Sequence, residues 1–478
     1  MKHGYREYHM DSIQGQMGNR ALGGLRSAFA KTFLPLNYPR SVRKEYAEYQ
    51  MWDSIQALSS YLRGVLSSRF VFAGIGVGNA DSTAMAAAMT WCLKDGIGIV
   101  SSLLFAYEYA SYFEAYPATW RLVADTLCNI GLLLNMSVGL LPSAYFLYIT
   151  TLSSICFGCL GIAAGASKSK ISAHLALEGH LSDVTAKEST QETAITLIGL
   201  LLGVGVTKFV GEGDMLMSWT IFLACTLGHQ YANYRLCRVL RFDTLNPQRV
   251  YLLAHTPNKA NPPDPKQLAQ MEQLFGIPIW LSLYGPLMGA PLSWLDETYA
   301  EDYYAAFLGK KYVIGLCGSR TMTQYGLGSH DTRQRVAVCL AADCEPPDEA
   351  EAYFAGCLYD ALVNRGAKCH SSTLLFSSLK VPQQPNQPSA KASGGGDNGS
   401  GISSASPSSS SHVRWTRNNV FKPTAEMFGE AHSPLTSTGV GSLWRGQHWD
   451  LRHVSMGPDM GYRYRYTPQN NARGKKAD

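Results

Sequence analysis

Four ionisable side chains stand inside or beside long uncharged segments of this sequence, where they could bind a ligand or line a polar path. Lys94 and Asp95 interrupt one apolar segment. Arg121 and Asp125 lie four residues apart, a spacing at which opposite charges pair on one face of a helix. Ionisable groups at membrane depth are costly and usually face a partner or a cavity. These four residues are therefore candidate ligand or polar-path residues.

A second polar group follows farther along the chain. Asp183, Lys187 and Gln191 recur every four residues and predict one polar helix face, with Glu188 and Glu192 beside it. Asp183, Lys187, Gln191 and Glu192 complete the set of candidate residues. The alternative is a water-exposed connector in which pairs of opposite charge contribute only about 0.2–0.5 kcal/mol each. The sequence leaves both interpretations open.

Three glycines could form a phosphate-binding loop. Gly74 and Gly76 match the first two positions of G-x-G-x-x-G, but Asn79 stands where the third glycine belongs. Neither a preceding strand nor a downstream acid that would bind a ribose is evident. The favoured interpretation is a helix boundary at which the Asn79 side chain caps free backbone N–H groups.

The sequence predicts neither a catalytic residue nor a metal site. Cys156 and Cys159 form the single C-x-x-C, which could be a redox pair or half a zinc site. No second pair lies at a fitting distance, and both residues fall in an apolar run, so packing is the favoured role. Motifs of serine hydrolases, zinc proteases and P-loop nucleotide-binding proteins are absent. We expect a protein that is not an enzyme.

Small residues recur at a spacing typical of close helix packing. Gly161 with Gly165, and Gly199 with Gly203, form two G-x-x-x-G pairs inside apolar segments. A missing side chain lets two helix backbones approach each other closely. The sequence predicts that both pairs lie at helix–helix contacts.

The longest apolar segment indicates the elements that hold the candidate residues. Residues 126–167 contain no Asp, Glu, Lys, Arg or His, and Pro142 alone interrupts them. A bilayer core needs roughly 20 apolar residues per helix, so this segment predicts two membrane-spanning helices that meet near Pro142. Buried helices of a large soluble protein are the alternative.

Two further segments bring the expected number of membrane crossings to about four. They are residues 193–207 and 215–234, and a polar connector at 168–192 precedes them. Arginines follow the last crossing directly, so the positive-inside rule places both chain ends on the cytosolic or equivalent side. Upstream, residues 46–62 predict an amphipathic helix, and residues 83–93 and 96–107 predict two short helices separated by Lys94 and Asp95.

The segment after residue 245 has the character of a small α+β domain. Strands are expected at 250–254, 312–316, 335–340 and 449–454, and helices at 265–275 and 349–366. This βαββαβ order predicts a ferredoxin-like topology. The fold class is thus mainly α, a polytopic helical membrane core with a small α+β C-terminal domain.

Composition supports a folded chain of several parts and limits its partners. Only 16% of the 478 residues are charged, the net charge is +5, and the 11 cysteines are scattered. No basic run with interleaved aromatic residues occurs, so nucleic acid is not an expected partner. The expected parts are a polar arm (1–33), a helical membrane domain (34–245), the first part of the α+β domain (246–380), a Pro/Gly/Ser-rich disordered linker (381–412) and the rest of that domain with a polar tail (413–478).

Several ordered strings resemble the root UV-B sensitive family. They are residues 34–41 (LPLNYPRS), 52–64 (WDSIQALSSYLRG), 74–78 (GIGVG), 91–96 (WCLKDG), 120–125 (WRLVAD) and 183–193 (DVTAKESTQET). The resemblance implies a membrane protein of unknown biochemical role, linked in plants to UV-B responses, auxin transport and vitamin B6 homeostasis, with some plastid members. Two departures from the family pattern are the AAGAS string at residues 163–167 and the Ser-rich linker.

These observations predict a multi-pass membrane protein that acts in signalling or small-molecule homeostasis without catalysis. The organelle stays open, with a plastid expected if the source is photosynthetic. No cofactor is required, but Lys94, Arg121 or Lys187 could supply the cation that the phosphate of pyridoxal phosphate needs. Two alternatives are a small-molecule transporter, and an interaction scaffold that pairs with another family member. The expected partners are therefore the lipid bilayer and, in the scaffold case, a second protein of the family.

Overall fold

The computed structural model divides the chain into two compact units. It describes residues 27–75, 84–211, 214–256, 262–275, 285–297, 307, 310–318, 334–364, 447–451, 454, 456 and 463–464. Unit 1 comprises Met1–Asp243 and Pro265–Leu274, and unit 2 comprises Thr244–Asp264 and Phe275–Asp478. The predicted cap at Asn79, the predicted linker at 381–412 and most of the predicted arm lie outside the described residues.

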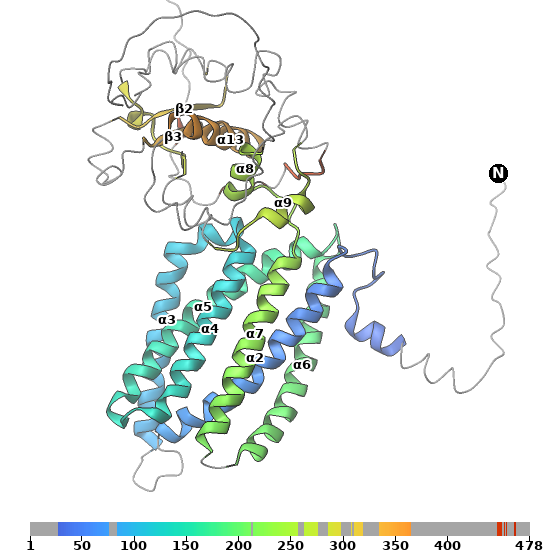
Figure 1. Ribbon diagram of the computed structural model, residues 1–478, viewed down its shortest axis with the longest axis vertical. Helices are drawn as coiled ribbons and strands as arrows, with labels where there is room; N and C mark the ends of the chain where they lie inside the picture. The colour runs from blue at the N-terminus through green and yellow to red at the C-terminus, as the bar shows by residue number, and fades with distance from the viewer. Residues whose placement is uncertain are drawn as a thin grey trace, which may run out of the picture. The chain divides into compact units, whose positions relative to one another are not determined.

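Unit 1 is a bundle of long helices that run side by side (Figure 1). They are α2 (Tyr46–Ile75), α3 (Ala84–Ala115), α4 (Pro117–Ser137), α5 (Phe146–Leu175), α6 (Leu181–Val210) and α7 (Met215–Val239), with the short α9 (Pro265–Met271). Two 3-10 turns, η1 (Val138–Leu140) and η2 (Ser143–Tyr145), separate α4 from α5. The predicted break near Pro142 is confirmed, because Pro142 lies between these turns.

Among the residues that the structure describes, four helical stretches are long and apolar enough to cross a membrane. They are Ala88–Ala115, Pro117–Leu140, Ser143–Leu175 and Leu181–Val210. Three of them cover the two halves of the 126–167 segment and the 193–207 segment. The segment predicted at 215–234 forms α7 but is not among the four, and α3 is among them instead. The number of candidate crossings agrees with the prediction, but their identity differs at one place.

One expectation about helix boundaries is wrong. Instead of two short helices there is one continuous α3, because Gly96 and Gly98 each cost a helix only about 1 kcal/mol and the charged pair finds partners within reach. The Lys94 ammonium lies 2.9 Å from an Asp95 carboxylate oxygen and 3.2 Å from Ser154 Oγ. The polar connector expected at 168–192 is mostly helical, since α5 continues to Leu175 and α6 begins at Leu181, and the predicted polar helix face lies on α6.

Glycines mark the closest helix contacts of the bundle, and only one predicted pair is among them. A Cβ added at Gly199 would lie 2.8 Å from Tyr61 Cβ, and one at Gly203 would lie 3.0 Å from Val65 Cγ2, so α6 packs tightly on α2. Gly161 and Gly165 have nothing within 4 Å of such a Cβ. The tightest contact joins Gly158 of α5 to Gly98 of α3, where an added Cβ would overlap the Gly98 carbonyl oxygen.

The described part of unit 2 combines a small mixed sheet with two helices. Its elements are α8 (Pro247–Ala254), β1 (Leu287–Met288), η3 (Leu292–Trp294), β2 (Tyr312–Leu316), β3 (Val336–Ala341), α13 (Pro346–Val363) and β4 (Arg463–Tyr464). The fully buried β3 pairs antiparallel with β2 and parallel with β1 and β4. The two central strands and the helices expected near 265–275 and 349–366 are confirmed.

The first and last strands expected in this unit are wrong. Residues 250–254 belong to α8, because Asn246 caps that helix through its side chain and Pro247 occupies the first turn. Near the end of the chain, Asp450 forms only an isolated bridge with Thr244, and the strand lies at β4 instead. The βαββαβ order and the ferredoxin-like topology are therefore not confirmed.

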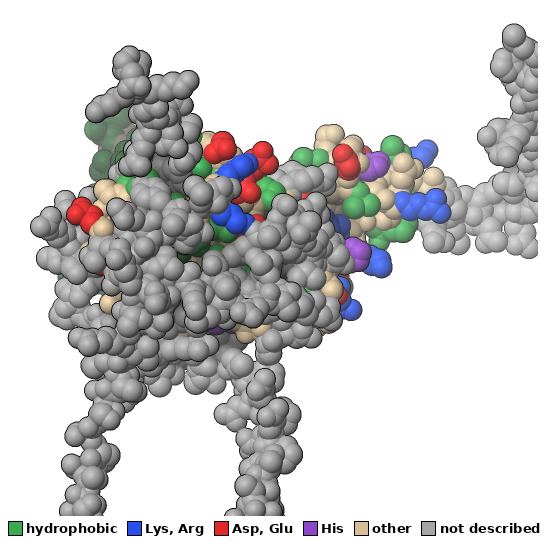
Figure 2. Space-filling view, turned by 90° about the horizontal axis from the view of Figure 1, so that it is seen from above, with side chains coloured by type: hydrophobic (Ala, Val, Ile, Leu, Met, Phe, Trp, Pro, Cys, Tyr) green, Lys and Arg blue, Asp and Glu red, His purple; other side chains and the backbone are tan. Residues whose placement is uncertain are grey.

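Figure 2 shows acidic and basic side chains interspersed on one face of the described part of the molecule.

Removal of the α8 cap should weaken unit 2 measurably. The Asn246 side chain accepts a hydrogen bond of 2.8 Å from the Arg249 backbone N–H, and α8 buries most of its side chains. Asn246→Ala is expected to cost about 1 kcal/mol of local stability, read as faster amide hydrogen exchange in α8. Asn246→Asp keeps a hydrogen-bond acceptor at the cap, so amide hydrogen exchange in α8 should be as slow as in the parent protein. Equal exchange in all three proteins would contradict the assigned cap.

Candidate functional site

The candidate site is a cavity of about 290 Å³ inside the bundle of unit 1, lined by α2, α4, α5 and α6. We call it the polar cavity, because ionisable and amide side chains from helices far apart in the sequence line it. Its acidic members are Asp53, Asp125, Glu188 and Glu192, and its basic members are Arg121 and Lys168. Cavities that bind small molecules typically measure roughly 300–1,000 Å³, so this one suits a compact ligand.

The deep end of the polar cavity is a cluster centred on Arg121. Arg121 Nη2 donates a 2.8 Å hydrogen bond to Asp53 Oδ1, and Arg121 Nε lies 3.2 Å from Asp125 Oδ2. The side chains of Arg121 and Asp125 are only 10% and 8% exposed. The pairing predicted from their four-residue spacing is thus confirmed, and a second carboxylate from α2 completes it.

Two uncharged groups extend this cluster toward α7. Gln56 Nε2 lies 3.2 Å from Asp125 Oδ1 and 3.0 Å from Nε2 of His229, which is fully buried. The sequence does not indicate Asp53, Gln56 or His229 as site residues. Asp53 and Gln56 lie within residues 46–62, for which the sequence predicts an amphipathic helix, and nothing local in the sequence links His229 to either of them.

Glu188 forms a separate buried acidic group of the polar cavity. Gln50 Nε2 donates to its Oε1 at 2.8 Å, and Ser172 Oγ donates to its Oε2 at 2.5 Å. Among the described residues, no lysine or arginine nitrogen lies within 4.0 Å of this carboxylate. These neutral donors supply hydrogen bonds that a carboxylate removed from water requires, and they leave its charge uncompensated whenever it is ionised.

Lys168 and Glu192 form the mouth of the polar cavity. Lys168 Nζ lies 2.5 Å from Glu192 Oε2, and the two side chains are 34% and 50% exposed. Exposure thus falls from this pair toward the Arg121 cluster. A ligand that enters here would exchange bulk water for buried polar groups.

The predicted polar face of α6 divides between two roles. Gln191 and Glu192 line the polar cavity, whereas Asp183 and Lys187 bind the chain that precedes α2. Asp183 Oδ2 accepts from the Leu36 backbone N–H at 2.5 Å, and Lys187 Nζ donates to the Lys31 carbonyl oxygen. Gln191 also reaches this chain, since its Nε2 donates to the Phe33 carbonyl oxygen at 2.6 Å.

The candidate cations for a phosphate do not converge. Lys94 binds Asp95 and Ser154 on another part of the bundle, Lys187 donates to a backbone oxygen, and only Arg121 lines the polar cavity. Four carboxylates and two cations line this cavity, so when all are ionised its charge is negative. Such a cavity favours a cationic or neutral ligand over an anionic one.

The described residues contain no cluster of three or more His, Cys, Asp or Glu side chains that could hold a metal ion. Cys156 is buried, Cys159 is half-buried, and both are free thiols. The packing role predicted for this pair agrees with their position in α5.

Comparison with known proteins relates the helical bundle to one family. Residues 19–259 match the family model described as the vitamin B6 photo-protection and homoeostasis domain. The chain is 34% identical over 254 residues to RUS family member 1 of Dictyostelium discoideum, covering 52% of this chain and 48% of the relative. It is 30% identical over 342 residues to protein root UVB sensitive 3 of Arabidopsis thaliana, covering 71% and 77%.

A third relative, protein root UVB sensitive 2, chloroplastic, of Arabidopsis thaliana, is 26% identical over 300 residues, or 60% of this chain and 67% of the relative. The chain thus spans about half the length of the Dictyostelium relative and about three quarters of the first Arabidopsis relative. No solved structure matches the chain significantly.

Proposed function

Because the chain belongs to the root UV-B sensitive family, we propose that it is a membrane protein of small-molecule homeostasis that binds its ligand in the polar cavity. The observation that carries this proposal is the convergence of four carboxylates and two cations on one cavity, where three of the four lining helices are apolar enough to cross a membrane. A purely structural core would avoid that arrangement, since each buried charge costs several kcal/mol unless it is paired.

The proposed membrane placement follows from the exposed surface of the same helices. Large apolar side chains are open to the surroundings on α3 and α6, among them Leu103, Leu104, Leu201 and Val204, each at least 57% exposed. Apolar surfaces of this extent are rare on soluble monomers and usual on lipid-facing helices. The proposal does not include an organelle. Of the relatives named above, one is called chloroplastic.

The charge of the polar cavity selects among the compounds that the family description names. Unphosphorylated forms of vitamin B6 such as pyridoxine and pyridoxamine carry hydroxyl, amine and pyridine groups on a single ring. These groups match the carboxylates and amides of the cavity, whereas the dianionic phosphate of pyridoxal phosphate meets four carboxylates. We infer a role in holding such a compound without chemical conversion.

Binding to the purified, detergent-solubilised protein tests this proposal. Calorimetric titration should give measurable affinity for pyridoxamine and at least tenfold weaker affinity for pyridoxal phosphate. Absence of binding by every form of vitamin B6 would overturn the proposal, and preference for the phosphorylated form would overturn the charge argument. Extraction of native membranes with carbonate tests the membrane placement separately, and release of the protein into the supernatant would contradict it.

Glu188→Gln should weaken the binding of pyridoxamine about tenfold, or about 1.4 kcal/mol, because hydrogen bonds to charged groups contribute roughly 1.5–3 kcal/mol each. Its matched control is Glu114→Gln, which removes a carboxylate that is 65% exposed and pairs with Lys170 outside the cavity. The same titration should leave the control at the affinity of the parent protein. Equal losses in both variants would remove Glu188 from the site.

A further inference from the structure

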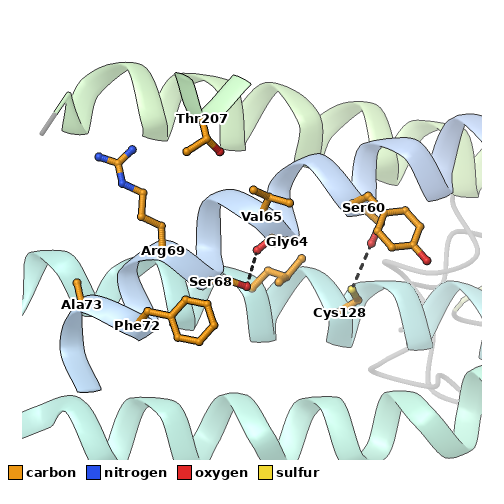
Figure 3. A pocket seen from close by; sticks show the side chains of 11 residues that line it. Ser60, Gly64, Val65, Ser68, Arg69, Phe72, Ala73, Cys128 and Thr207 are labelled. Atoms are coloured by element: carbon orange, nitrogen blue, oxygen red, sulfur yellow. Dashed lines mark hydrogen bonds between the residues drawn. The ribbon is translucent and has the colours of Figure 1, made fainter. Parts of the chain in front are cut away.

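A second and larger cavity, much of which is open to the surroundings of the bundle, adjoins the polar cavity. It measures about 800 Å³ and is lined by α2, α4 and α6 (Figure 3). Ser60, Tyr61 and Cys128 line both cavities. The second cavity carries mostly apolar and small side chains, with Arg69 as its one charged lining residue among those described.

The two cavities together follow nearly the whole length of α2. Lining residues of this helix extend from Gln50 in the polar cavity to Ala73 in the second cavity. At 1.5 Å per residue this distance is about 35 Å, which matches the roughly 30 Å of a bilayer hydrocarbon core. Lining residues of α4 and α6 accompany it, since Cys128 and Leu132 follow Arg121 and Asp125, and Thr207 lies beyond Glu192.

We propose that the two cavities are sections of one path along which a neutral polar ligand crosses the membrane, with Tyr61 as the closure between them. This inference rests on the proposed function, because the ligand is the one bound in the polar cavity. It goes further by assigning a transport activity, a route and a closing residue.

Tyr61 is held at the junction by contacts to α6. Its hydroxyl lies 2.5 Å from Thr196 Oγ1, and the bare Gly199 backbone lets α6 approach the Tyr61 side chain closely. On the other side of the junction Ser60 Oγ lies 3.9 Å from Cys128 Sγ of α4 (Figure 3). These contacts join α2 to α4 and α6 where the cavities meet, and movement of one tyrosine ring would connect them.

The charges along the path restrict the ligand further than the polar cavity alone. The polar cavity carries an excess of carboxylates, whereas the second cavity presents Arg69, whose Nη1 is buried without a hydrogen-bond partner among the described residues. A strongly cationic ligand would be repelled by Arg69, and an anionic one by the carboxylates. A compound of zero net charge with hydroxyl groups, such as pyridoxine, passes both.

Native cysteines allow a direct test of the path. A cationic, membrane-impermeant methanethiosulfonate reagent should modify Cys128 in the reconstituted protein, and saturating pyridoxine should slow this modification at least threefold. Cys237 provides an internal control, because it is only 3% exposed and lies in a core cluster. Modification of each cysteine is read by peptide mass spectrometry. Reaction of Cys128 only with lipid-soluble maleimides would overturn the path and identify the second cavity as a lipid site.

Uptake of labelled pyridoxine into proteoliposomes tests transport and closure. Uptake into liposomes that contain the parent protein should exceed uptake into empty liposomes. Tyr61→Ala should raise the initial rate of uptake at least threefold. Tyr61→Phe loses only the hydroxyl that meets Thr196, so it should fold and raise the rate less. Tyr148→Ala is the matched control, since Tyr148 is 73% exposed on α5 and lines neither cavity.

The outcomes separate the two proposals. Pyridoxine binding by calorimetry with no uptake by the parent or by either Tyr61 variant would overturn the path and leave the binding function standing. Loss of binding by the parent protein would remove both. Uptake that is equal in the parent, Tyr61→Ala and Tyr61→Phe proteins would overturn the assignment of Tyr61 as the closure.

Discussion

Replacement of Arg121 by Met is expected to destabilise the bundle by about 3–5 kcal/mol, which is the cost of breaking a buried ion pair by removing one partner. The reason is geometric. Arg121 is the only cation within 4.0 Å of Asp53 and Asp125 among the described residues, and it lies between them. Without it two carboxylates face each other with little exposure to solvent. The measurement is the unfolding midpoint in mixed micelles, titrated with a denaturing detergent.

Two further variants distinguish this electrostatic cost from simple loss of packing. Arg121→Met combined with Asp125→Asn removes one of the stranded charges and should recover a large part of the lost stability. Lys168→Met breaks the exposed pair with Glu192 and should cost at most about 1 kcal/mol, as surface ion pairs do. If Arg121→Met were as mild as Lys168→Met, the ion pairs of the deep cluster would contribute no more than an exposed pair, and the assigned electrostatic cost would be wrong.

The sequence predicted the helices of unit 1 well because their signal is local. An uncharged segment of the length of residues 126–167 has few structural options, and one proline is enough to divide it. The signal failed where a charge or glycine interrupted an apolar segment. Lys94 and Gly96 look like a break, but α3 continues because Lys94 reaches Ser154 of α5, a contact that the sequence of α3 cannot reveal.

The site was only half predictable for a related reason. Arg121 and Asp125 lie on one helix, so their spacing alone predicts that they pair. Asp53 and His229 come from α2 and α7, and only the packing of these helices on α4 brings them to the cluster. Periodicity shows which residues share one face of a helix, but it does not show which other helix packs against that face.

The same limit explains the polar face of α6. Its residues were predicted to act together, yet they divide between the polar cavity and the chain that precedes α2. Glu188, which the sequence placed only beside that face, is the buried carboxylate of the cavity. In α8 the run VYLLA fits a strand and a helix equally well, and the capping side chain of Asn246 decides in favour of the helix.

Gly158→Ala is expected to lower the stability of the bundle by about 3 kcal/mol, at the upper end of the usual cost of overpacking. An added Cβ would overlap the carbonyl oxygen of Gly98, and a Cβ at Gly98 would in turn lie 2.9 Å from the Ser154 carbonyl oxygen. These neighbours are backbone atoms of α3 and α5, so no side-chain rotation can relieve the overlap. The two helices must separate, and the detergent unfolding midpoint should fall accordingly.

Gly161→Ala is the matched control, because it lies in the same helix one turn later with nothing within 4 Å of an added Cβ. It should be neutral or stabilising by up to about 1 kcal/mol, the difference in helix propensity between glycine and alanine. The sequence treats these positions in the opposite way, since Gly161 belongs to a G-x-x-x-G pair and Gly158 does not. A larger loss for Gly161→Ala than for Gly158→Ala would therefore favour the sequence motif over the observed contact between α3 and α5.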